Sequence, residues 1–131
     1  MPKAEGLTLA FEDQTHIRAD LLETLPYEGE DQIIHMNYPE FSAMCPFSGL
    51  PDIAVIDVSY VPNKKIVELK SLKYYYLSFR NMGIYQEDMT NRLYCDLKKL
   101  LEPKELYIRT LYNVRGGIET VCEIGKIKEE R

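Results

Sequence analysis

An alternating run at residues 53–60 constrains the fold of this chain more than any other feature of its sequence. Every second residue in the run is apolar, a period that is typical of a strand with one buried face. The apolar positions are Ala54, Ile56, Val58 and Tyr60. Such a strand needs neighbouring strands for its backbone groups and a covering layer over its apolar face.

More strand segments are expected around this run. Residues 30–38 predict a strand, and residues 41–52, with two prolines and a glycine, predict an irregular loop. Residues 61–64 are typical of a turn. We therefore expect residues 65–69 to return as the second strand of a hairpin with residues 53–60.

Two helices are expected next. Ser71 is a favourable N-cap, and apolar residues follow it at helical spacing as far as Phe79. A second helix is predicted from Tyr85 to Leu101, with five apolar residues on one face. Pro103 ends this helix, because proline cannot continue one.

Two further alternating strands complete the predicted elements. They cover residues 106–112 and 118–124, and Arg115, Gly116 and Gly117 lie in the turn between them. The order is therefore β-hairpin, two helices, β-hairpin. Since the helices are grouped and do not alternate with strands, the sequence predicts an α+β fold with an antiparallel sheet and two helices on one face.

The length of 131 residues supports one domain with a modest core. We expect residues 1–29 to form an N-terminal arm, residues 30–125 the single domain, and residues 126–131 a charged tail. Residues 1–25 are polar with scattered leucines, so we expect the arm to be loosely attached.

Composition limits the partners and the compartment. The formal net charge of −5 argues against a general nucleic-acid binder, and no apolar run approaches the roughly 20 residues that span a bilayer. Three cysteines without framework spacing favour a reducing cytoplasm. They are Cys45, Cys95 and Cys122. A metal site is not expected, because His16 and His35 stand at no ligand spacing from another His or Cys.

Cys45 is the first candidate for chemistry, because it lies in the proline-bounded loop with Asp52 seven residues later. A loop thiol becomes a thiolate nucleophile if its pKa is lowered. The alternative is a small buried hydrophobe, which is the usual state of a free cysteine. The local sequence leaves both interpretations open.

Four lysines within ten residues favour either a phosphate site or a solvated charged face. They are Lys64, Lys65, Lys70 and Lys73. Residues 68–73 end a predicted strand and begin a predicted helix, where free backbone N–H groups suit a phosphate. Ser71 can equally serve only as the helix cap.

Gln86, Glu87 and Asp88 begin the second predicted helix, where the helix dipole alone favours acidic residues. The functional alternative is that Glu87 binds a ligand with several N–H groups, such as a purine edge, because a carboxylate accepts two such bonds at once. Arg115 stands beside two glycines that permit close backbone approach.

Five separated motifs occur in one order along the chain. They are Phe-Ser-Ala-Met-Cys-Pro with Pro-Asp at 41–52, Glu-Leu-Lys-Ser-Leu-Lys at 68–73, Ser-Phe-Arg-Asn at 78–81, Glu-Asp at 87–88 with Asn91, and Arg-Gly-Gly at 115–117. Together they resemble the single-module NADPH-dependent 7-cyano-7-deazaguanine reductases (the QueF family), the nitrile reductases of the queuosine pathway. The resemblance covers about residues 35–125.

The resemblance implies a tunnelling fold (T-fold), the architecture of GTP cyclohydrolase I, in which ββααββ subunits assemble into rings. Two pentameric rings usually stack into a decamer in this family, with active sites between subunits. The implied enzyme is an NADPH-dependent nitrile oxidoreductase. It reduces the nitrile of 7-cyano-7-deazaguanine to the amine 7-aminomethyl-7-deazaguanine, with two NADPH, during tRNA modification.

Carried onto this chain, the resemblance implies that Cys45 forms a thioimide with the nitrile carbon and that Asp52 is the proton donor. The implied substrate-binding residues are Val67, Glu68, Leu69, Gln86 and Glu87. The implied residues for the cofactor NADPH are Lys70, Ser71, Lys73, Arg115 and Gly116. The charge, the histidine spacing and the lack of a long apolar run, given above, lead us to expect no metal ligand, no nucleic-acid partner and no membrane partner.

Gln86 departs from the family pattern, in which a histidine commonly precedes the glutamate. Glutamine can hydrogen-bond to a ligand, but it cannot titrate near neutral pH. Two rival functions remain. One is an archaeosine-type amidinotransferase that acts on nitrile-bearing tRNA. Such enzymes lack the lysine motif, which is complete here at residues 68–73. The other is a purine-binding ring protein that has lost turnover.

Overall fold

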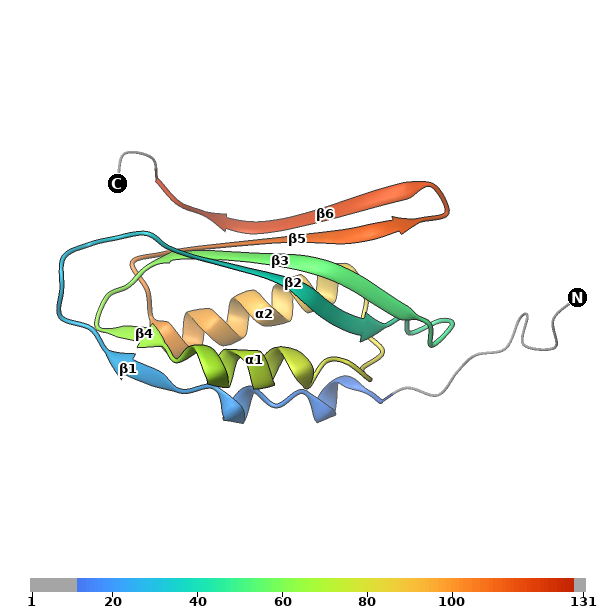
Figure 1. Cartoon of the computed structure of the whole chain (residues 1–131), viewed down its shortest axis with the longest axis horizontal. Coiled ribbons are helices and arrows are strands. Elements are labelled where there is room, and N and C mark those ends of the chain that lie inside the picture. Colours follow the sequence, from blue (N-terminus) through green and yellow to red (C-terminus); the bar gives the residue numbers. More distant parts are fainter. Residues whose placement is uncertain (1–11, 129–131) are drawn as a thin grey trace, which may run out of the picture.

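A four-stranded antiparallel sheet with helices packed on one face forms the body of the molecule (Figure 1). The computed structural model describes residues 12–128. The sheet order is β2–β3–β5–β6, and the predicted α+β class is confirmed. The four strands are β2 (Ile34–Met44), β3 (Pro51–Val61), β5 (Glu105–Arg115) and β6 (Ile118–Lys126).

The alternation in β3 has the predicted effect. Its four apolar positions at 54, 56, 58 and 60 are each at most 1% exposed and face the helices. Asp52 continues the same face at the start of the strand and is 6% exposed. The pleat that builds the core therefore also places a carboxyl group on the buried side of the sheet.

The strand predicted at residues 30–38 is β2, and it extends much further than expected, to Met44. The pairing of β2 with β3 shifts register between Tyr38 and Phe41, where Pro39 lies, and Pro51 is the first residue of β3. Both are positions where a strand tolerates the missing N–H of proline. The predicted loop at residues 41–52 therefore shrinks to residues 45–50.

The predicted hairpin between residues 53–60 and 65–69 is wrong. β3 pairs with β2 on one edge and β5 on the other, so it has no free edge for the next segment. That segment is β4 (Lys65–Val67), and it pairs with β1 (Thr24–Pro26) in a separate two-stranded sheet.

The expectation of a loosely attached arm is also wrong for the part of the arm that the structure describes. Short 3₁₀ turns η1 (Gln14–His16) and η2 (Ala19–Leu21) precede β1, and Ile17 and Leu22 are buried in the core. Residues 1–11 of the predicted arm and residues 129–131 of the predicted tail lie outside the described residues.

Helix α1 (Leu69–Leu77) begins earlier than predicted. Glu68, not Ser71, is the N-cap: its carboxylate accepts hydrogen bonds from the backbone N–H groups of Lys70 (2.8 Å) and Ser71 (2.9 Å). The hydroxyl of Ser71 instead accepts from the backbone N–H of Glu23 at 3.0 Å. A carboxylate one turn upstream thus outcompeted the serine as the cap.

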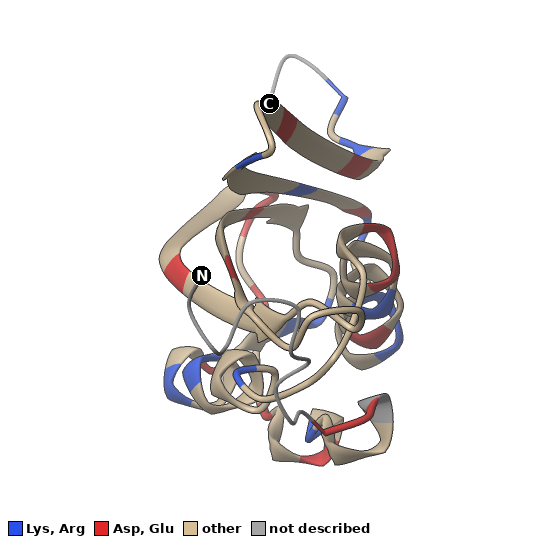
Figure 2. Ribbon diagram, turned by 90° about the vertical axis from the view of Figure 1, so that its right-hand side faces the viewer, with Lys and Arg blue, Asp and Glu red and all other residues tan. Residues whose placement is uncertain are grey.

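Helix α2 (Gln86–Leu101) matches its predicted bounds within one residue and buries the predicted apolar face except for Leu100, which is half-buried. Glu102 ends it in the left-handed conformation (φ 45°), one residue before Pro103. In the end-on view of Figure 2 both helices lie on one side of the curved sheet. Within residues 12–128, neither helix combines the length and apolar character that crossing a bilayer requires.

Candidate functional site

The loop between β2 and β3 presents Cys45. The backbone N–H of Cys45 donates to the carbonyl of Leu50, and the N–H of Gly49 donates to the carbonyl of Cys45, each at 2.8 Å. Gly49 has φ 73°, a conformation that favours glycine. The loop is therefore a closed turn with a defined shape, not an unstructured connection.

Two backbone hydrogen bonds hold this loop beside the start of α2. The N–H of Met44 donates to the carbonyl of Met82 (2.8 Å), and the N–H of Ile84 donates to the carbonyl of Met44 (3.1 Å). Gln86 begins α2 two residues after Ile84. The thiol and the first turn of α2, which are more than 40 positions apart in the sequence, are thereby brought together.

Hydrogen bonding favours the thiolate of Cys45. Burial raises the pKa of the thiol, but the backbone N–H groups of Ser48 and Phe47 and the hydroxyl of Ser48 donate toward the sulfur and lower it. The nearby charge of Asp52 acts against them, yet the net pKa is lowered. The side chain is only partly buried. A partly exposed thiol with a lowered pKa has the properties of a nucleophile, not of a core cysteine.

A pocket of about 520 Å³ opens over this thiol. Its volume lies in the range of small-molecule sites. Three loops or strand ends and the first turn of α2 contribute to it. The lining residues are Cys45, Phe47, Ser48, Leu50, Asp52, Tyr85, Gln86, Glu87 and Arg115.

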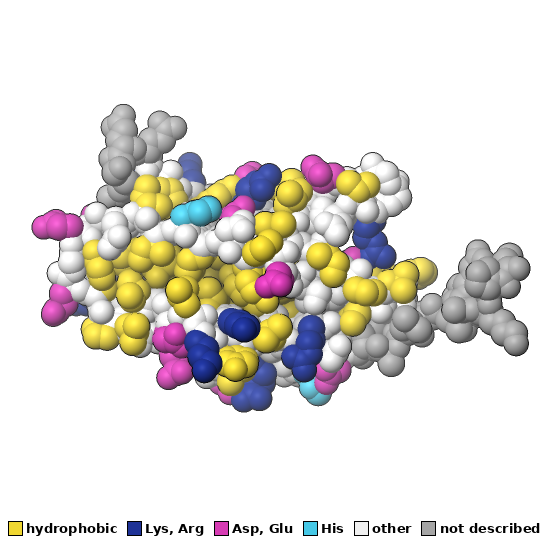
Figure 3. Space-filling view, in the orientation of Figure 1, with side chains coloured by type: hydrophobic (Ala, Val, Ile, Leu, Met, Phe, Trp, Pro, Cys, Tyr) yellow, Lys and Arg dark blue, Asp and Glu magenta, His cyan; other side chains and the backbone are white. Residues whose placement is uncertain are grey.

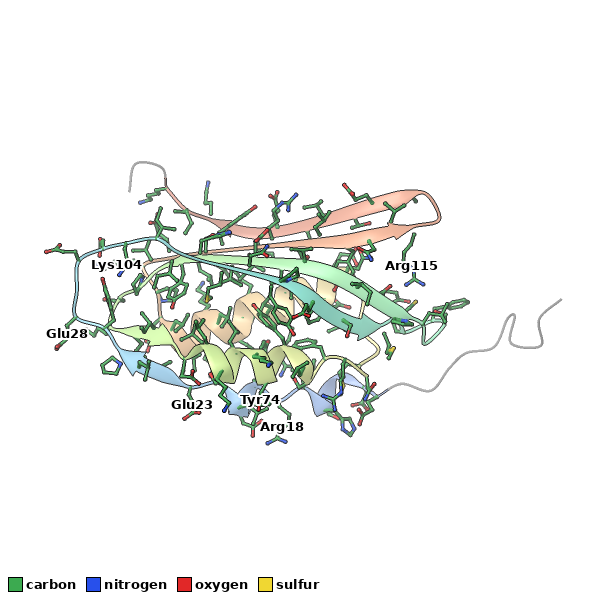
Figure 4. All side chains as sticks on the ribbon, viewed as in Figure 1. Arg18, Glu23, Glu28, Tyr74, Lys104 and Arg115 are labelled. Atoms are coloured by element: carbon green, nitrogen blue, oxygen red, sulfur yellow. The ribbon has the colours of Figure 1, made fainter. Side chains whose placement is uncertain are left out.

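Asp52 lies at the base of this pocket and forms an ion pair with Arg115. The carboxylate side chain is 7% exposed, whereas the guanidinium side chain is 40% exposed. Figure 4 shows Arg115 at the end of the molecule where β5 meets β6, with its side chain pointing toward the loop between β2 and β3. The sequence prediction had placed Arg115 with the cofactor and had not paired it with Asp52.

Glu87 lines the pocket from the first turn of α2 and is exposed, and Gln86 beside it is partly buried. Tyr85 (56% exposed) and Phe47 (80% exposed) add aromatic faces near the mouth. A carboxylate beside aromatic rings suits a planar heterocycle that presents N–H groups.

Gly116 follows Arg115 in the turn between β5 and β6, whereas the predicted site residues between 67 and 73 lie at the opposite end of the subunit. β3 runs from Asp52 to Val61, roughly 30 Å at the rise of a strand, and β4 and the start of α1 follow there (Figure 1). In Figure 4, Glu23, whose backbone contacts Ser71, is likewise far from Arg115. Residues 67–73 therefore do not meet Cys45 within one chain.

The environments in this second group differ. Val67 and Ser71 are buried, and the N–H of Val67 donates to the hydroxyl of Tyr60 at 3.1 Å. Lys70 and Lys73 are exposed, as is Leu69 at 64%. The exposed members are available to a ligand, whereas Ser71 serves the fold.

Sequence reasoning missed several pocket residues. Phe47 and Ser48 follow Cys45 closely, and their place in a tight turn was the available signal. Tyr112 does not line the pocket and carried no signal in the sequence: it is 2% exposed, and no group among residues 12–128 hydrogen-bonds to its hydroxyl. Burial raises the pKa of this phenol, as do the charges of Asp52, Cys122 and Glu87. It therefore stays neutral behind the pocket.

The family described as QueF-like protein matches residues 51–131. The chain belongs to the QueF-like family. Proteins of Thermotoga petrophila and Thermotoga maritima, each named NADPH-dependent 7-cyano-7-deazaguanine reductase, are 50% identical to it over 132 residues, which cover 100% of this chain and 96% of each relative. The reductase of the same name from Chloroherpeton thalassium is 49% identical over 79% of this chain and 91% of its own length.

The crystal structure of the apo archaeosine synthase QueF-Like shares the fold of this QueF-like chain. The TM-score is 0.63, with 19% identity, over 78% of this chain and all of that one. This likeness concerns the fold alone and supports the predicted ββααββ T-fold. Within residues 12–128, no group of three His, Cys, Asp or Glu side chains is arranged to hold a metal ion.

Proposed function

We propose that this QueF-like chain is an NADPH-dependent nitrile oxidoreductase that reduces 7-cyano-7-deazaguanine to 7-aminomethyl-7-deazaguanine. The observation that carries the proposal is the pocket that combines a thiol of lowered pKa, a buried carboxyl group and an exposed carboxylate. The relatives that are 50% identical over 96% of their length carry the same activity in their names.

Cys45 is the nucleophile. A nitrile is a poor hydride acceptor, and attack of the sulfur on the nitrile carbon gives a thioimide whose carbon is more electrophilic. The N–H groups of Phe47 and Ser48 that favour the thiolate prepare the sulfur for this attack. The pocket is wide enough to admit a bicyclic heterocycle.

Asp52 and Glu87 have separate roles in this proposal. Asp52, at the base of the pocket, gives a proton to the nitrogen that becomes negative as the sulfur attacks. Glu87, exposed on the first turn of α2, accepts hydrogen bonds from the N–H groups of the deazapurine edge. Gln86 adds a neutral amide and no titratable group near neutral pH.

The exposed cations fit the phosphates of NADPH. Lys70 and Lys73 are exposed, and no ion pair among the described residues engages them. Open space surrounds Gly116 and Gly117, where an added Cβ would meet nothing within 4 Å. Bound NADPH supplies hydride, and conversion of the nitrile to the amine consumes two hydrides and two protons. Lys70, Lys73, Arg115 and Gly116 would hold the phosphates and ribose.

A complete site in this proposal needs more than one subunit, because residues 67–73 lie far from Cys45 within one chain. β2 and β6 are the edge strands of the four-stranded sheet, and edge strands readily pair with another chain. Figure 3 shows a band of hydrophobic side chains between the sheet and α1 on the face it draws. We therefore propose a ring-shaped homo-oligomer in which a neighbour's residues 67–73 complete the pocket, with Leu69 at the contact.

The proposed compartment is the cytoplasm, where reducing conditions keep Cys45 free. All three cysteines are free in the structure. The amidinotransferase alternative is not favoured, because the likeness to the archaeosine synthase is 19% identical and concerns the fold, whereas the reductases are 50% identical.

The proposal predicts that the purified chain oxidises NADPH when 7-cyano-7-deazaguanine is added. Two NADPH are consumed for each amine formed, because four reducing equivalents separate a nitrile from an amine. Cofactor absorbance and product mass spectrometry measure the ratio. Formation of a covalent adduct without NADPH oxidation would refute the reductase function while leaving the nucleophile in place.

Lys73→Ala is expected to weaken NADPH binding about tenfold, because one charge-assisted contact to a phosphate is lost. Adduct formation with the nitrile, measured without cofactor, keeps its rate. Lys99→Ala, which removes an exposed lysine from α2, is the matched control and changes neither quantity. If Lys73→Ala affected both ligands equally, the cofactor site would lie elsewhere.

A further inference from the structure

The ion pair at the base of the pocket determines the state in which Asp52 starts the reaction. Its carboxylate is 7% exposed and contacts the guanidinium of Arg115. A carboxylate so deeply buried is stable in the ionised form only with such a partner. An ionised carboxylate holds no proton to donate, so the proton that Asp52 delivers must first reach it from another group.

The thiol form of Cys45 lines the same pocket and can supply this proton. We infer that Arg115 is a positioning residue for proton transfer: it holds Asp52 ionised and oriented beside Cys45, so that Asp52 takes the thiol proton and passes it to the nitrile nitrogen. This inference rests on the proposed function. In this mechanism Arg115 has a role before any cofactor is bound.

The step is balanced. The S–H bond of Cys45 breaks as its proton passes to a carboxylate oxygen of Asp52, and the sulfur forms a bond to the nitrile carbon. One π bond of the nitrile breaks, and its electron pair goes to the nitrogen. The O–H bond then breaks as an N–H bond forms. The products are a thioimide and an Asp52 carboxylate that pairs again with Arg115, with no net gain or loss of protons or electrons.

Two features of the site support this role for Arg115. The charge of Asp52 acts against the thiolate of Cys45, and a guanidinium on the carboxylate neutralises that charge. The pairing of β5 with β6 also shifts register between Tyr112 and Arg115, at the point where Arg115 reaches Asp52. A cofactor ligand alone would need neither feature.

The test measures adduct formation in the absence of NADPH. The full chain is mixed with 7-cyano-7-deazaguanine, and the adduct is followed over time by intact mass. We expect Arg115→Ala to form it about 10- to 100-fold more slowly than the unmodified chain, a smaller loss than removal of the positioned acid or base itself would cause. Arg115→Lys recovers part of the rate. Where the alanine variant does not fold, Arg115→Gln replaces it.

Arg109→Ala is the matched control. Arg109 lies on the same strand, on the sheet face away from the helices, and its nearest acidic partners are Glu123 (3.8 Å) and Asp57 (3.9 Å). Its loss is expected to leave adduct formation unchanged. If Arg109→Ala slowed adduct formation to a similar extent, loss of any cationic side chain from β5 would have the same effect. That result would overturn the inference.

The double variant tests whether Arg115 acts through Asp52. In an Asp52→Asn chain, Arg115→Ala is expected to slow adduct formation no further, because the two residues serve one step. An undiminished rate in Arg115→Ala, or full additivity in the double variant, would overturn the inference while the proposed reductase stands. No adduct in the unmodified chain would overturn both.

Discussion

Cys45→Ala is expected to abolish the covalent adduct and to lower NADPH-dependent turnover by at least about 10⁴-fold, the scale seen when a catalytic nucleophile is removed. No other cysteine can replace it, because Cys95 and Cys122 do not line the pocket. The partly exposed side chain contributes little to the core, so the fold and the assembly state remain. Intact mass, turnover and size-exclusion chromatography measure the three outcomes.

Cys122→Ala is the matched control, since Cys122 is also a partly buried free cysteine, on β6. It is expected to keep both adduct and turnover. Nitrile reduction that survived in Cys45→Ala would exclude the thioimide mechanism, whatever the control showed.

The lowered pKa of Cys45 adds a pH dependence to this prediction. A thiol of lowered pKa remains partly thiolate as the pH falls, so alkylation of Cys45 by iodoacetamide persists to lower pH than alkylation of a cysteine in an unstructured peptide. The hydrogen bonds from the turn at Phe47 and Ser48 cause this difference. Unfolding in denaturant removes the turn and is expected to abolish the difference in pH dependence between Cys45 and the peptide cysteine.

Features that depend on local periodicity were predicted well. The buried face of β3 and the bounds of α2 follow from the spacing of apolar residues within one element, and both agree with the structure. Cys45 as a candidate nucleophile also came from local information, a thiol in a turn bounded by prolines, and this role stays a prediction. The competing interpretation, a core cysteine, is inconsistent with its lowered pKa and partial exposure.

Features that depend on distant partners were not predictable in this way. Residues 65–69 resembled the return of a hairpin, but their partner, β1, lies about 40 residues upstream in a segment expected to be loose. The helix cap depended on competition between Glu68 and Ser71, which local preference for serine decided wrongly. In each case, the tertiary arrangement selected between locally acceptable choices.

The candidate site shows the same difference between local features and features that depend on distant partners. Asp52 and Arg115 are 63 positions apart, and their contact requires the register of β3 with β5. The motif at residues 68–73 was assigned with Cys45 to a site between subunits, and β3 holds the two groups at opposite ends of one subunit. Sequence motifs identify residues of one function without showing which subunit supplies them.

Asp52→Asn is expected to slow formation of the thioimide about 10²- to 10⁴-fold, the usual contribution of a positioned acid or base. The amide keeps the shape of the side chain, but it neither accepts the thiol proton nor donates one to the nitrile nitrogen. Asp57→Asn is the matched control: Asp57 lies on the same strand, accepts a hydrogen bond from Asn37 at 2.7 Å and does not line the pocket. Asp57→Asn is expected to form the thioimide at the rate of the unmodified chain.

The same pair of variants separates proton transfer from binding. Equilibrium binding of the nitrile to Asp52→Asn, measured in a Cys45→Ala background that cannot form the adduct, is expected to change little, because Glu87 holds the heterocycle in the proposed mode. A large loss of binding would show that Asp52 is a substrate ligand and would remove its role as a proton donor. A slowed reaction with unchanged binding places the loss in the transition state, where a proton must reach the nitrogen as the carbon–sulfur bond forms.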